Sequence, residues 1–515
     1  MELIRGHEAI ADCNSGEMTL PDLIIHAQPP LKFIPPAFNP LVLRVGQQVL
    51  PFWIHSHLGI TEIQADNADV LVDLYRQFQE RKIRFLIAFR HPKVDDPLCM
   101  AHLLWQIVPQ LARQQGIGLQ APIHAHFIYD RGIPLWAGSQ VGWLYSRLGC
   151  TPIHRGKADW TGLRSARDLF ANGQLPMAAA PEGATNGHNE IISPLEPGIA
   201  QLGFWCVEDL LKAGRSEQVL IVPVGIQYRY VEAPWQSLEK LLSELEEASD
   251  LPKEDAIATP ALAMPEASAD SSDLQIEGSN QPPGFSPYEA SLYRRLSRLG
   301  EHLLSSMEEF YSRFYHQIPA KGIDNPSPRQ SSPIDANDAF AVRLQALLHT
   351  ALQVAETYFG LSPKGTLIDR CRRLEQAGWN YIYREDFKDI KAVSPLRRGL
   401  ADRIAEEANL RMWHMRLVET FVAVTGHYVA EKPTVERFAE TTLLLWDVVT
   451  RLKGGNPFQR PRLGNQRVQI TVGQPLSVSE RYSVYQESRH RARLAVADLT
   501  QDLQHSLESL ISLGA

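Results

Sequence analysis

Short apolar runs alternate with longer amphipathic stretches over residues 60–231. The runs lack regular polar positions, which is typical of strands that helices cover on both faces. The stretches between them carry apolar residues every three or four positions, which predicts helices. This alternation predicts an α/β domain. The expected strands are IRFLIAF (83–89), LPMAAA (175–180) and VLIVPVGIQYRYV (219–231), the last broken at Pro223, and the clearest helices span about 97–115 and 198–213.

Helical periodicity resumes over 287–316 and, in several segments, over 335–453. Two apolar stripes in the second range follow helical spacing, so we expect both to face a helical core. The first stripe is Leu410, Trp413, Leu417, Phe421 and Val424, and the second is Phe438, Leu445, Val448 and Leu452.

A strand pattern returns at 467–472, where Val468, Ile470 and Val472 alternate with polar residues before Gly473 and Pro475. The last helix carries an apolar face made of Val496, Leu499, Leu503, Leu507 and Leu510. The predicted fold is therefore α/β, with a central mixed sheet and flanking helices, interrupted by a large helical insert.

An acidic stretch separates the first part of this domain from the insert. Between Glu239 and Glu277 there are 11 acidic and 2 basic residues, and proline and serine are frequent. Such a composition buries too little apolar surface to offset ordering, which predicts a disordered linker. The expected organisation is a lead-in with an amphipathic segment (1–59), the first part of the α/β domain (60–231), the linker (232–286), the helical insert (287–465) and the final strand and helix of the α/β domain (466–515).

The segment FNPLVLRVGQQVLPFWIHSHLGI (38–60) is strongly apolar but carries interspersed polar residues. It fits a core helix or strand pair, or an element in a membrane interface, where Phe52 and Trp53 would suit the headgroup boundary. No run of about 18 apolar residues occurs, so a spanning helix is not expected. The first residues contain no secretory pattern.

Charge and cysteine content narrow the class of protein. The 515 residues include 51 Lys plus Arg and 59 Asp plus Glu, and outside the acidic stretch the balance is close to +1. Nucleic-acid binding needs clustered positive charge, so no nucleic-acid partner is expected. The five cysteines are far apart and form no CxxC pair, which indicates a reducing, cytoplasmic compartment.

The stretch FRHPKVDDPLCM (89–100) is the first candidate for chemistry. His91 directly follows a predicted strand, and Asp96 lies five residues later, before a predicted helix. Ligand sites of open α/β sheets lie at the carboxyl ends of strands. A carboxylate at this spacing can fold back to one imidazole nitrogen and leave the other to accept a proton from a hydroxyl. A solvated turn with incidental charges is the alternative for this motif alone.

Three further blocks follow in order: GCTPIHRGK (149–157), AAPEGATNG (179–187) and LIVPVGIQY (220–228). Together the four blocks resemble the glycerolipid acyltransferase family of 1-acyl-glycerol-3-phosphate acyltransferases. The family's H-x4-D matches His91 to Asp96, its G-x-x-x-I-x-R matches 149–155, its P-E-G matches 181–183 and its V-P-V strand matches 222–224. VGQPL (472–476) also resembles the family's late Gly-x-Pro strand end. The resemblance covers about 60–231 and 466–512, and does not cover the insert.

This resemblance implies a peripheral membrane enzyme that transfers a fatty acyl group from acyl-CoA or acyl carrier protein to a glycerolipid hydroxyl, with 1-acyl-glycerol-3-phosphate as the leading acceptor in phospholipid synthesis. His91 and Asp96 would be the catalytic pair, His91 as general base and Asp96 as its orienting group. Arg155 would hold the acceptor phosphate. Glu182 and Gly183 would shape the acceptor site, with Glu182 accepting from glycerol hydroxyls. No cofactor or metal is implied.

Several positions depart from the family pattern. Arg90 stands where the family usually has Asn, Ala184, Thr185 and Asn186 replace Thr-Arg-Ser, and Glu196 replaces a basic residue. The sequence therefore has fewer positive groups for a phosphate. Acylation of a lysolipid or another lipid alcohol stays open, as does a scaffold that keeps the fold and binds a partner through its insert.

Other motifs in the sequence give weaker evidence of function. No G-x-S-x-G occurs, so a serine-hydrolase site is unsupported. HSH (55–57) and HAH (124–126) would place paired imidazoles on one face of a strand, but neither has a third ligand nearby in sequence. We expect structural or solvated histidines at both places and no metal site.

Overall fold

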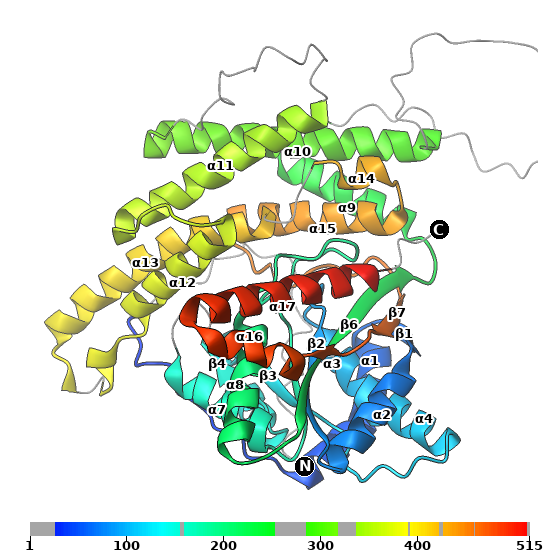
Figure 1. Cartoon of the computed structure of the whole chain (residues 1–515). Helices are drawn as coiled ribbons and strands as arrows, with labels where there is room; N and C mark the ends of the chain where they lie inside the picture. The colour runs from blue at the N-terminus through cyan, green and yellow to red at the C-terminus, as the bar shows by residue number, and fades with distance from the viewer. Residues whose placement is uncertain are drawn as a thin grey trace, which may run out of the picture.

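The computed structural model describes residues 26–154, 159–252, 285–317, 336–389, 392–421, 426–457 and 459–511 (Figure 1). An eight-stranded sheet lies at the centre of the fold, in the order β1-β7-β6-β2-β5-β3-β4, with β8 paired to β6. The strands are β1 (Ile60–Asp66), β2 (Ile83–Phe89), β3 (His126–Asp130), β4 (Thr151–Ile153), β5 (Met177–Ala179), β6 (Gln218–Tyr230), β7 (Gln466–Val472) and β8 (Leu476–Ser477).

The sheet is mixed, as the sequence predicts, although most of its pairings are parallel. Strands β6, β2, β5, β3 and β4 run parallel, whereas β7 is antiparallel to β6 and β1 is parallel to β7. In this register Phe89, the last residue of β2, pairs with Val224 in the middle of β6. Strand β6 therefore extends beyond the end of β2, and its last residues flank the segment that follows β2.

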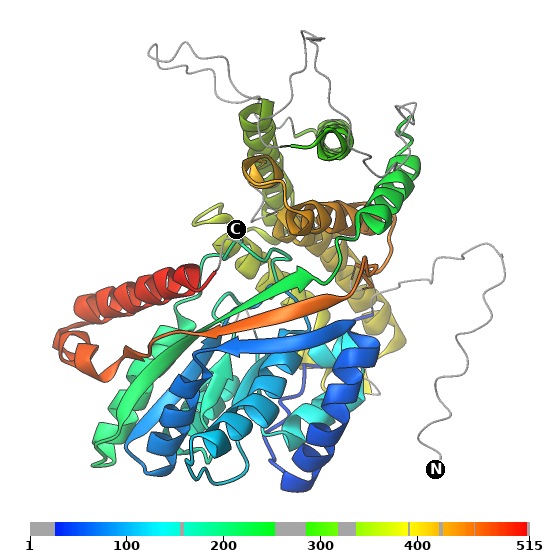
Figure 2. The same ribbon diagram turned by 90° about the vertical axis from the view of Figure 1, so that its right-hand side faces the viewer.

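Helices cover both faces of the sheet, and α1 and α17 lie on opposite sides of it (Figure 2). One apolar core includes residues of α1–α4 and the strands, and another includes residues of α7, α8, α17 and the strands. The helices of this sheet domain are α1 (Pro40–His57), α2 (Ala68–Gln79), α3 (Asp96–His102), α4 (Val108–Gln114), α5 (Ile133–Ala137), α6 (Ser139–Arg147), α7 (Trp160–Asn172), α8 (Gly198–Lys212), α16 (Tyr482–Glu487) and α17 (Arg489–Ser509). A π-helical turn, Leu103–Ile107, joins α3 to α4.

The chain between β6 and β7 forms a group of helices that we call the helical segment. It lies above the sheet domain in Figure 1 and has an apolar core of its own. Its helices are α9 (Trp235–Ala248), α10 (Pro287–Tyr315), α11 (Ala336–Phe359), α12 (Leu367–Ile382), α13 (Pro395–Phe421), α14 (Tyr428–Glu431) and α15 (Val435–Leu452). Because β6 and β7 are neighbours, the helical segment occupies the place of a loop between two adjacent antiparallel strands.

Four expectations from the sequence are wrong in detail. Strand β6 continues through Pro223, whose carbonyl accepts from Gly473 N at 2.8 Å. Residues 235–248, placed in the linker by their acidity, form α9, because Leu238, Leu241, Leu242 and Leu245 give it an apolar face. The imidazoles of HSH (55–57) lie on α1 and not on a strand. Of the two stripes expected to face the core, Leu410 is 58% exposed and Leu452 is 41% exposed. In α13 a different face, including Ala408, Met412 and Met415, turns to the core.

The rest of the linker, 253–284, and Val424 lie outside the described residues.

Candidate functional site

His91 and Asp96 meet at the carboxyl end of β2. His91 is the second residue after the strand, and Asp96 is the first residue of α3. The distance from His91 Nδ1 to Asp96 Oδ2 is 3.0 Å. A carboxylate only accepts hydrogen bonds, so Nδ1 carries the proton and Nε2 is left with its lone pair. The His91 side chain is 20% exposed and no described residue hydrogen-bonds to Nε2, so a substrate hydroxyl can approach it.

Asp96 is fully buried, and its two oxygens accept three hydrogen bonds. Oδ2 accepts from His91 Nδ1 and from Lys93 N at 2.8 Å, and Oδ1 accepts from the phenol of Tyr228 on β6. Burial raises the pKa of Tyr228 well above its usual value, so its hydroxyl keeps the proton that it donates. These donors satisfy the carboxylate in the interior and fix its orientation toward His91.

The Lys93 ammonium lies 4.1 Å from the centre of the Tyr228 ring and donates to Gln466 Oε1. Burial lowers the pKa of Lys93, and burial also raises the pKa of the neighbouring Asp95. A cation over an aromatic face is a favourable contact, which holds the Tyr228 ring in place.

Glu182 lies beside His91 and is 3% exposed. Its Oε1 accepts from the backbone N–H of His91 at 2.8 Å, and its Oε2 accepts from Ser193 N at 3.1 Å and Asn186 Nδ2 at 3.3 Å. Burial raises the pKa of Glu182, while the charge of Arg90 opposes that shift. Both oxygens are thus engaged within the protein, so Glu182 supports the His91 backbone and a substrate hydroxyl would have to share these oxygens.

Gly183 follows with φ +71°, a left-handed conformation that favours glycine. A Cβ at this position would also meet the carboxylate of Glu196, so that side chain would have to shift.

Arg90 is completely buried and directs its guanidinium away from solvent, into the loop that follows the Pro-Glu-Gly turn. It donates to the carbonyl oxygens of His188 and Ile191, both at 2.6 Å, and to that of Asn189. Three carbonyl acceptors on one guanidinium fix a loop that has no regular secondary structure. The residue that departs from the family pattern is thus a structural clamp.

Arg155, the predicted phosphate ligand, lies in 155–158, outside the described residues. The residues on either side of it are held together, because Asp159 Oδ2 accepts from His154 N at 3.0 Å and also from Arg131. His154 follows β4, and β4 is parallel to β2, so His154 and His91 lie along the same edge of the sheet. His154 is therefore held at this edge of the sheet.

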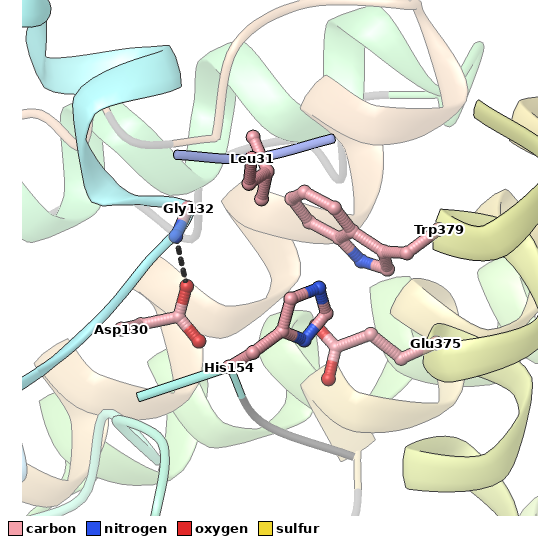
Figure 3. Close-up of a pocket in the computed structure, with 6 residues that line it drawn as sticks. All are labelled: Leu31, Asp130, Gly132, His154, Glu375 and Trp379. Carbon is pink, nitrogen blue, oxygen red and sulfur yellow. Dashed lines mark hydrogen bonds between the residues drawn. The ribbon is translucent and has the colours of Figure 1, made fainter. Parts of the chain in front are cut away.

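The helical segment covers this edge near β3 and β4. A cavity of about 10 Å³, the space of a single water, lies between the two parts of the chain (Figure 3). Trp379 of α12 stands over His154, with ring centroids 5.6 Å apart. The cavity is lined by Leu31, Asp130, Gly132, His154, Glu375 and Trp379.

A second, open groove of about 470 Å³ lies between residues 192–197 and α17. Its wall includes Ile192, Leu195 and Ala497 and is mainly apolar. Ser193, in the same stretch of chain, donates to Glu182. The groove therefore borders the loop that supports His91.

Polar contacts join the helical segment to the loop 188–196. Arg372 of α12 pairs with Glu196 at 3.0 Å, Arg437 of α15 pairs with Glu190 at 2.7 Å, and Glu440 of α15 accepts from Asn189 Nδ2 at 2.6 Å. Glu196, which replaces a basic residue of the family pattern, thus binds a cation of the helical segment.

The paired histidines outside this edge have structural roles. His124 accepts from Trp105 Nε1 at 3.0 Å through Nδ1, and its Nε2 donates to Leu148 O at 3.0 Å. His126 Nδ1 donates to Gly149 O at 2.8 Å. Among the described residues, no group of three or more His, Cys, Asp or Glu is arranged to hold a metal ion.

The sequence reasoning missed Tyr228, Asn189 and Glu440, although all three belong to the surroundings of Asp96 and His91. Alternation along β6 places Tyr228 on the same face as Val224 and Ile226, which was a usable signal. Its contact with Asp96 depends on the register of β6 against β2, which the sequence did not supply.

No family model, no curated protein and no solved structure matches this chain. In the part of the chain that the structure describes, every helix is too short or too polar to cross a membrane.

Proposed function

We propose that the protein is an O-acyltransferase that moves a fatty acyl group from an acyl thioester to the hydroxyl of a glycerolipid. The observation that carries this proposal is the His91–Asp96 pair, in which a buried, fully hydrogen-bonded carboxylate holds Nδ1 and leaves Nε2 accessible. Its place at the carboxyl end of a parallel strand is where α/β folds bind substrates. The four sequence blocks that resemble the glycerolipid acyltransferases supply the reaction type.

In the proposed reaction, His91 Nε2 takes the proton of the acceptor hydroxyl while the hydroxyl oxygen attacks the thioester carbonyl carbon. The new C–O bond gives a tetrahedral intermediate, and the C–S bond then breaks. The imidazolium returns its proton to the leaving sulfur, so the products are an ester and a free thiol. Asp96 stabilises the imidazolium and holds the tautomer.

Glu182 accepts from the backbone N–H of His91, and this contact supports a positioning role for Glu182, with Gly183 forming the turn that follows it. We place the acceptor phosphate on Arg155, as the sequence motif suggests. The apolar groove between 192–197 and α17 is the place that we assign to an acyl chain.

A non-phosphorylated lipid alcohol is the second candidate acceptor, and a specific observation favours it. Three described arginines near the site already bind protein groups. Arg90 binds loop carbonyls, Arg372 pairs with Glu196, and Arg460, which lies against Gly187, pairs with Asp447. Guanidinium groups engaged in this way have fewer N–H donors free for a phosphate, which weakens the case for a phosphorylated acceptor.

The direct test is to supply purified protein with radiolabelled palmitoyl-CoA, or with acyl carrier protein that carries a radiolabelled palmitoyl group. Each candidate acceptor is then added in a separate reaction. We expect an ester product with 1-acyl-glycerol-3-phosphate, and its loss in His91→Ala. Product formed only from monoacylglycerol or another neutral alcohol would support the second acceptor. If no acceptor is acylated from either donor, the protein is a scaffold and the enzymatic proposal is wrong.

We also propose that α1 lies in a membrane interface, because one of its faces is apolar and exposed. Leu43, Leu50 and Ile54 face the core, whereas the other face leaves Leu41, Val45, Val49, Phe52 and Trp53 between 45% and 69% exposed. An aromatic pair at the end of such a face suits the lipid headgroup boundary.

Flotation with vesicles of phosphatidylglycerol and phosphatidylethanolamine tests this surface. The double variant Phe52→Ser with Trp53→Ser should lose most of the vesicle-bound fraction. Leu211→Ser, which removes a single apolar side chain of similar exposure from α8, should keep it. Equal binding by both variants would show that α1 is not the contact.

A further inference from the structure

A continuous series of hydrogen bonds runs from the helical segment to the candidate base. Glu440 of α15 accepts from Asn189, Asn189 holds the backbone of Tyr228, Tyr228 donates to Asp96, and Asp96 accepts from His91. The first four side chains are buried, with exposed fractions of 7%, 3%, 1% and 0%. Water therefore has little access to replace these contacts.

Asn189 completes the edge of β6 where β2 no longer pairs with it. The pairing with β2 ends at Val224, and four residues later Tyr228 N donates to Asn189 Oδ1 at 2.8 Å while Asn189 Nδ2 donates to Tyr228 O at 3.0 Å. One side-chain amide thus supplies the two hydrogen bonds that a neighbouring strand would make. This contact fixes the backbone from which the Tyr228 ring extends toward Asp96.

Glu440 in turn fixes Asn189. Its Oε1 accepts from Asn189 Nδ2 at 2.6 Å, and its Oε2 accepts from the hydroxyl of Tyr428 at 2.6 Å. The Asn189 amide nitrogen has two hydrogens, so it serves Tyr228 and Glu440 together. A carboxylate acceptor gives a stronger hydrogen bond than a neutral one.

We propose that Tyr228 is a positioning residue for the His91–Asp96 pair, and that Glu440 of the helical segment keeps it in place through Asn189. The helical segment is then a necessary part of the site, although it supplies no group that touches the reacting atoms. The inference rests on the proposed acyl transfer for its kinetic effect, whereas the geometry of the pair can be observed without any reaction.

The kinetic test compares Tyr228→Phe with Tyr75→Phe, because Tyr75 is an equally buried tyrosine whose hydroxyl donates to His124 O, within the core that contains α2. Tyr228→Phe should lower kcat about tenfold, the effect expected for one hydrogen bond to a charged group, with both KM values changed less than about twofold. Tyr75→Phe should keep kcat within about twofold.

A double variant separates positioning from a general structural effect. If Tyr228 acts through His91, adding Tyr228→Phe to His91→Ala should cause less than about a twofold further loss. A further tenfold loss in that background would overturn the proposal, because it would show that Tyr228 acts independently of His91.

The contribution of the helical segment is tested with the variants Glu440→Met and Glu440→Gln. Met removes the acceptor and should lower kcat as Tyr228→Phe does, whereas Gln can still present an oxygen to Asn189 and should recover most of the rate. Tyr428→Phe, which removes one donor to Glu440, is the milder variant should Glu440→Met not fold. Tyr311→Phe, which removes a buried hydroxyl bonded to His414 within the helical segment, is the control. Equal rates for Glu440→Met, Tyr428→Phe and the control would overturn the proposal that Glu440 keeps Tyr228 in place.

A readout without substrate distinguishes this inference from the proposed function. In protein labelled with ¹⁵N-histidine, the His91 ring signals are identified by their absence in His91→Gln. These signals should shift or broaden in Tyr228→Phe and Glu440→Met and stay in place in Tyr75→Phe. Unchanged signals in all three variants would overturn the inference. Shifted signals in a protein that acylates no acceptor would leave the inference standing and remove the proposed function.

Discussion

The sheet domain and the helical segment are built in the same way inside but differ in what they place at their shared boundary. Each buries its apolar residues in cores of its own, two against the faces of the sheet and one among the helices. At the boundary, ring contacts such as that of Trp379 with His154 lie beside directional contacts between charged or amide groups. These polar contacts are Arg437 with Glu190, Arg372 with Glu196, and Asn189 with Glu440. The difference teaches that apolar faces build each part and that polar pairs fix how the parts join.

This division has a physical reason. The hydrophobic effect is non-directional, so apolar burial by itself does not specify how two surfaces are oriented. A hydrogen bond weakens steeply when its angle or distance changes. Polar pairs at the boundary therefore specify one placement of the helical segment over the loop that supports His91.

The largest effect is expected inside the sheet domain. His91→Ala should lower turnover by about 10² to 10⁴, the usual contribution of a positioned proton acceptor. Circular dichroism and the unfolding midpoint should stay close to the wild type, and the exposed His505→Ala on α17 serves as control. Turnover like the wild type in folded His91→Ala would show that the base lies elsewhere.

The next largest effect is expected on stability, at the boundary between the sheet domain and the helical segment. Arg437 and Glu190 are 8% and 2% exposed, and Arg437→Met would leave Glu190 buried with Arg229 as its remaining cation. Breaking a buried pair by removing one partner typically costs about 3 to 5 kcal/mol. Urea denaturation should show a loss of this size. A loss below about 1 kcal/mol would show that water enters the boundary and that its polar pairs do not fix the two parts.

Acidification should lower the free energy of unfolding by a comparable amount. Because each part contains a buried histidine, the acid dependence can report on the two parts separately. Burial lowers the pKa of His124 in the sheet domain and of His414 in the helical segment to about 4. Unfolded histidine binds a proton near pH 6.5, so between pH 6.5 and 4 the unfolded state binds protons that the folded state does not. Stability therefore falls as the pH falls, by about 3 kcal/mol for each histidine.

Denaturant titrations at pH 7 and pH 4.5 measure this loss. His414→Gln should reduce the acid sensitivity of the unfolding of the helical segment, and His124→Gln that of the sheet domain. If the two parts unfold together, either variant should reduce the sensitivity of one shared transition. Unchanged acid sensitivity in both variants would show that neither imidazole stays neutral in the fold.

The smallest effect is expected on the exposed side of the helical segment. Arg343 of α11 pairs with Glu301 and Glu308 of α10, but its side chain is 35% exposed. Exposed pairs contribute about 0 to 1 kcal/mol, so Arg343→Met should change the unfolding free energy by less than about 1 kcal/mol. A loss equal to that of Arg437→Met would remove the distinction between boundary and surface pairs.

Periodicity predicted much of the fold, because it records which faces are apolar. Strands β2, β6 and β7 and helices α8 and α10 lie close to their predicted positions. The pattern also predicted the meeting of His91 and Asp96, since both are local to one strand-to-helix connection. Composition misled at α9, whose leucines are buried and whose acidic residues are exposed or partly exposed except for Glu246, which is buried and pairs with Arg295 of α10.

The remainder of the site depends on contacts between residues far apart in the chain. Asn189 and Glu440 are 251 positions apart, and Tyr228 and Asp96 are 132 positions apart. Hydropathy patterns carry no information on which polar side chain will meet which, because that depends on strand register and on how the helices are placed. Arg90 illustrates this limit, since it was visible as a departure from a motif but its three carbonyl partners were not.

The position of β7 has a consequence for folding during synthesis. Strand β1 ends at Asp66 and pairs with β7, which begins at Gln466, so 400 positions separate the two strands. At about 5 to 20 residues per second, the ribosome needs roughly 20 to 80 s to supply β7 after β1 has emerged. Throughout that time β1 lacks the strand that joins it to the sheet, and once β6 has been made, its edge that receives β7 stays open for the rest of the interval. Unpaired strand edges readily capture other chains. Yield in the cell should therefore depend on chaperones that cover this edge until the last tenth of the chain arrives.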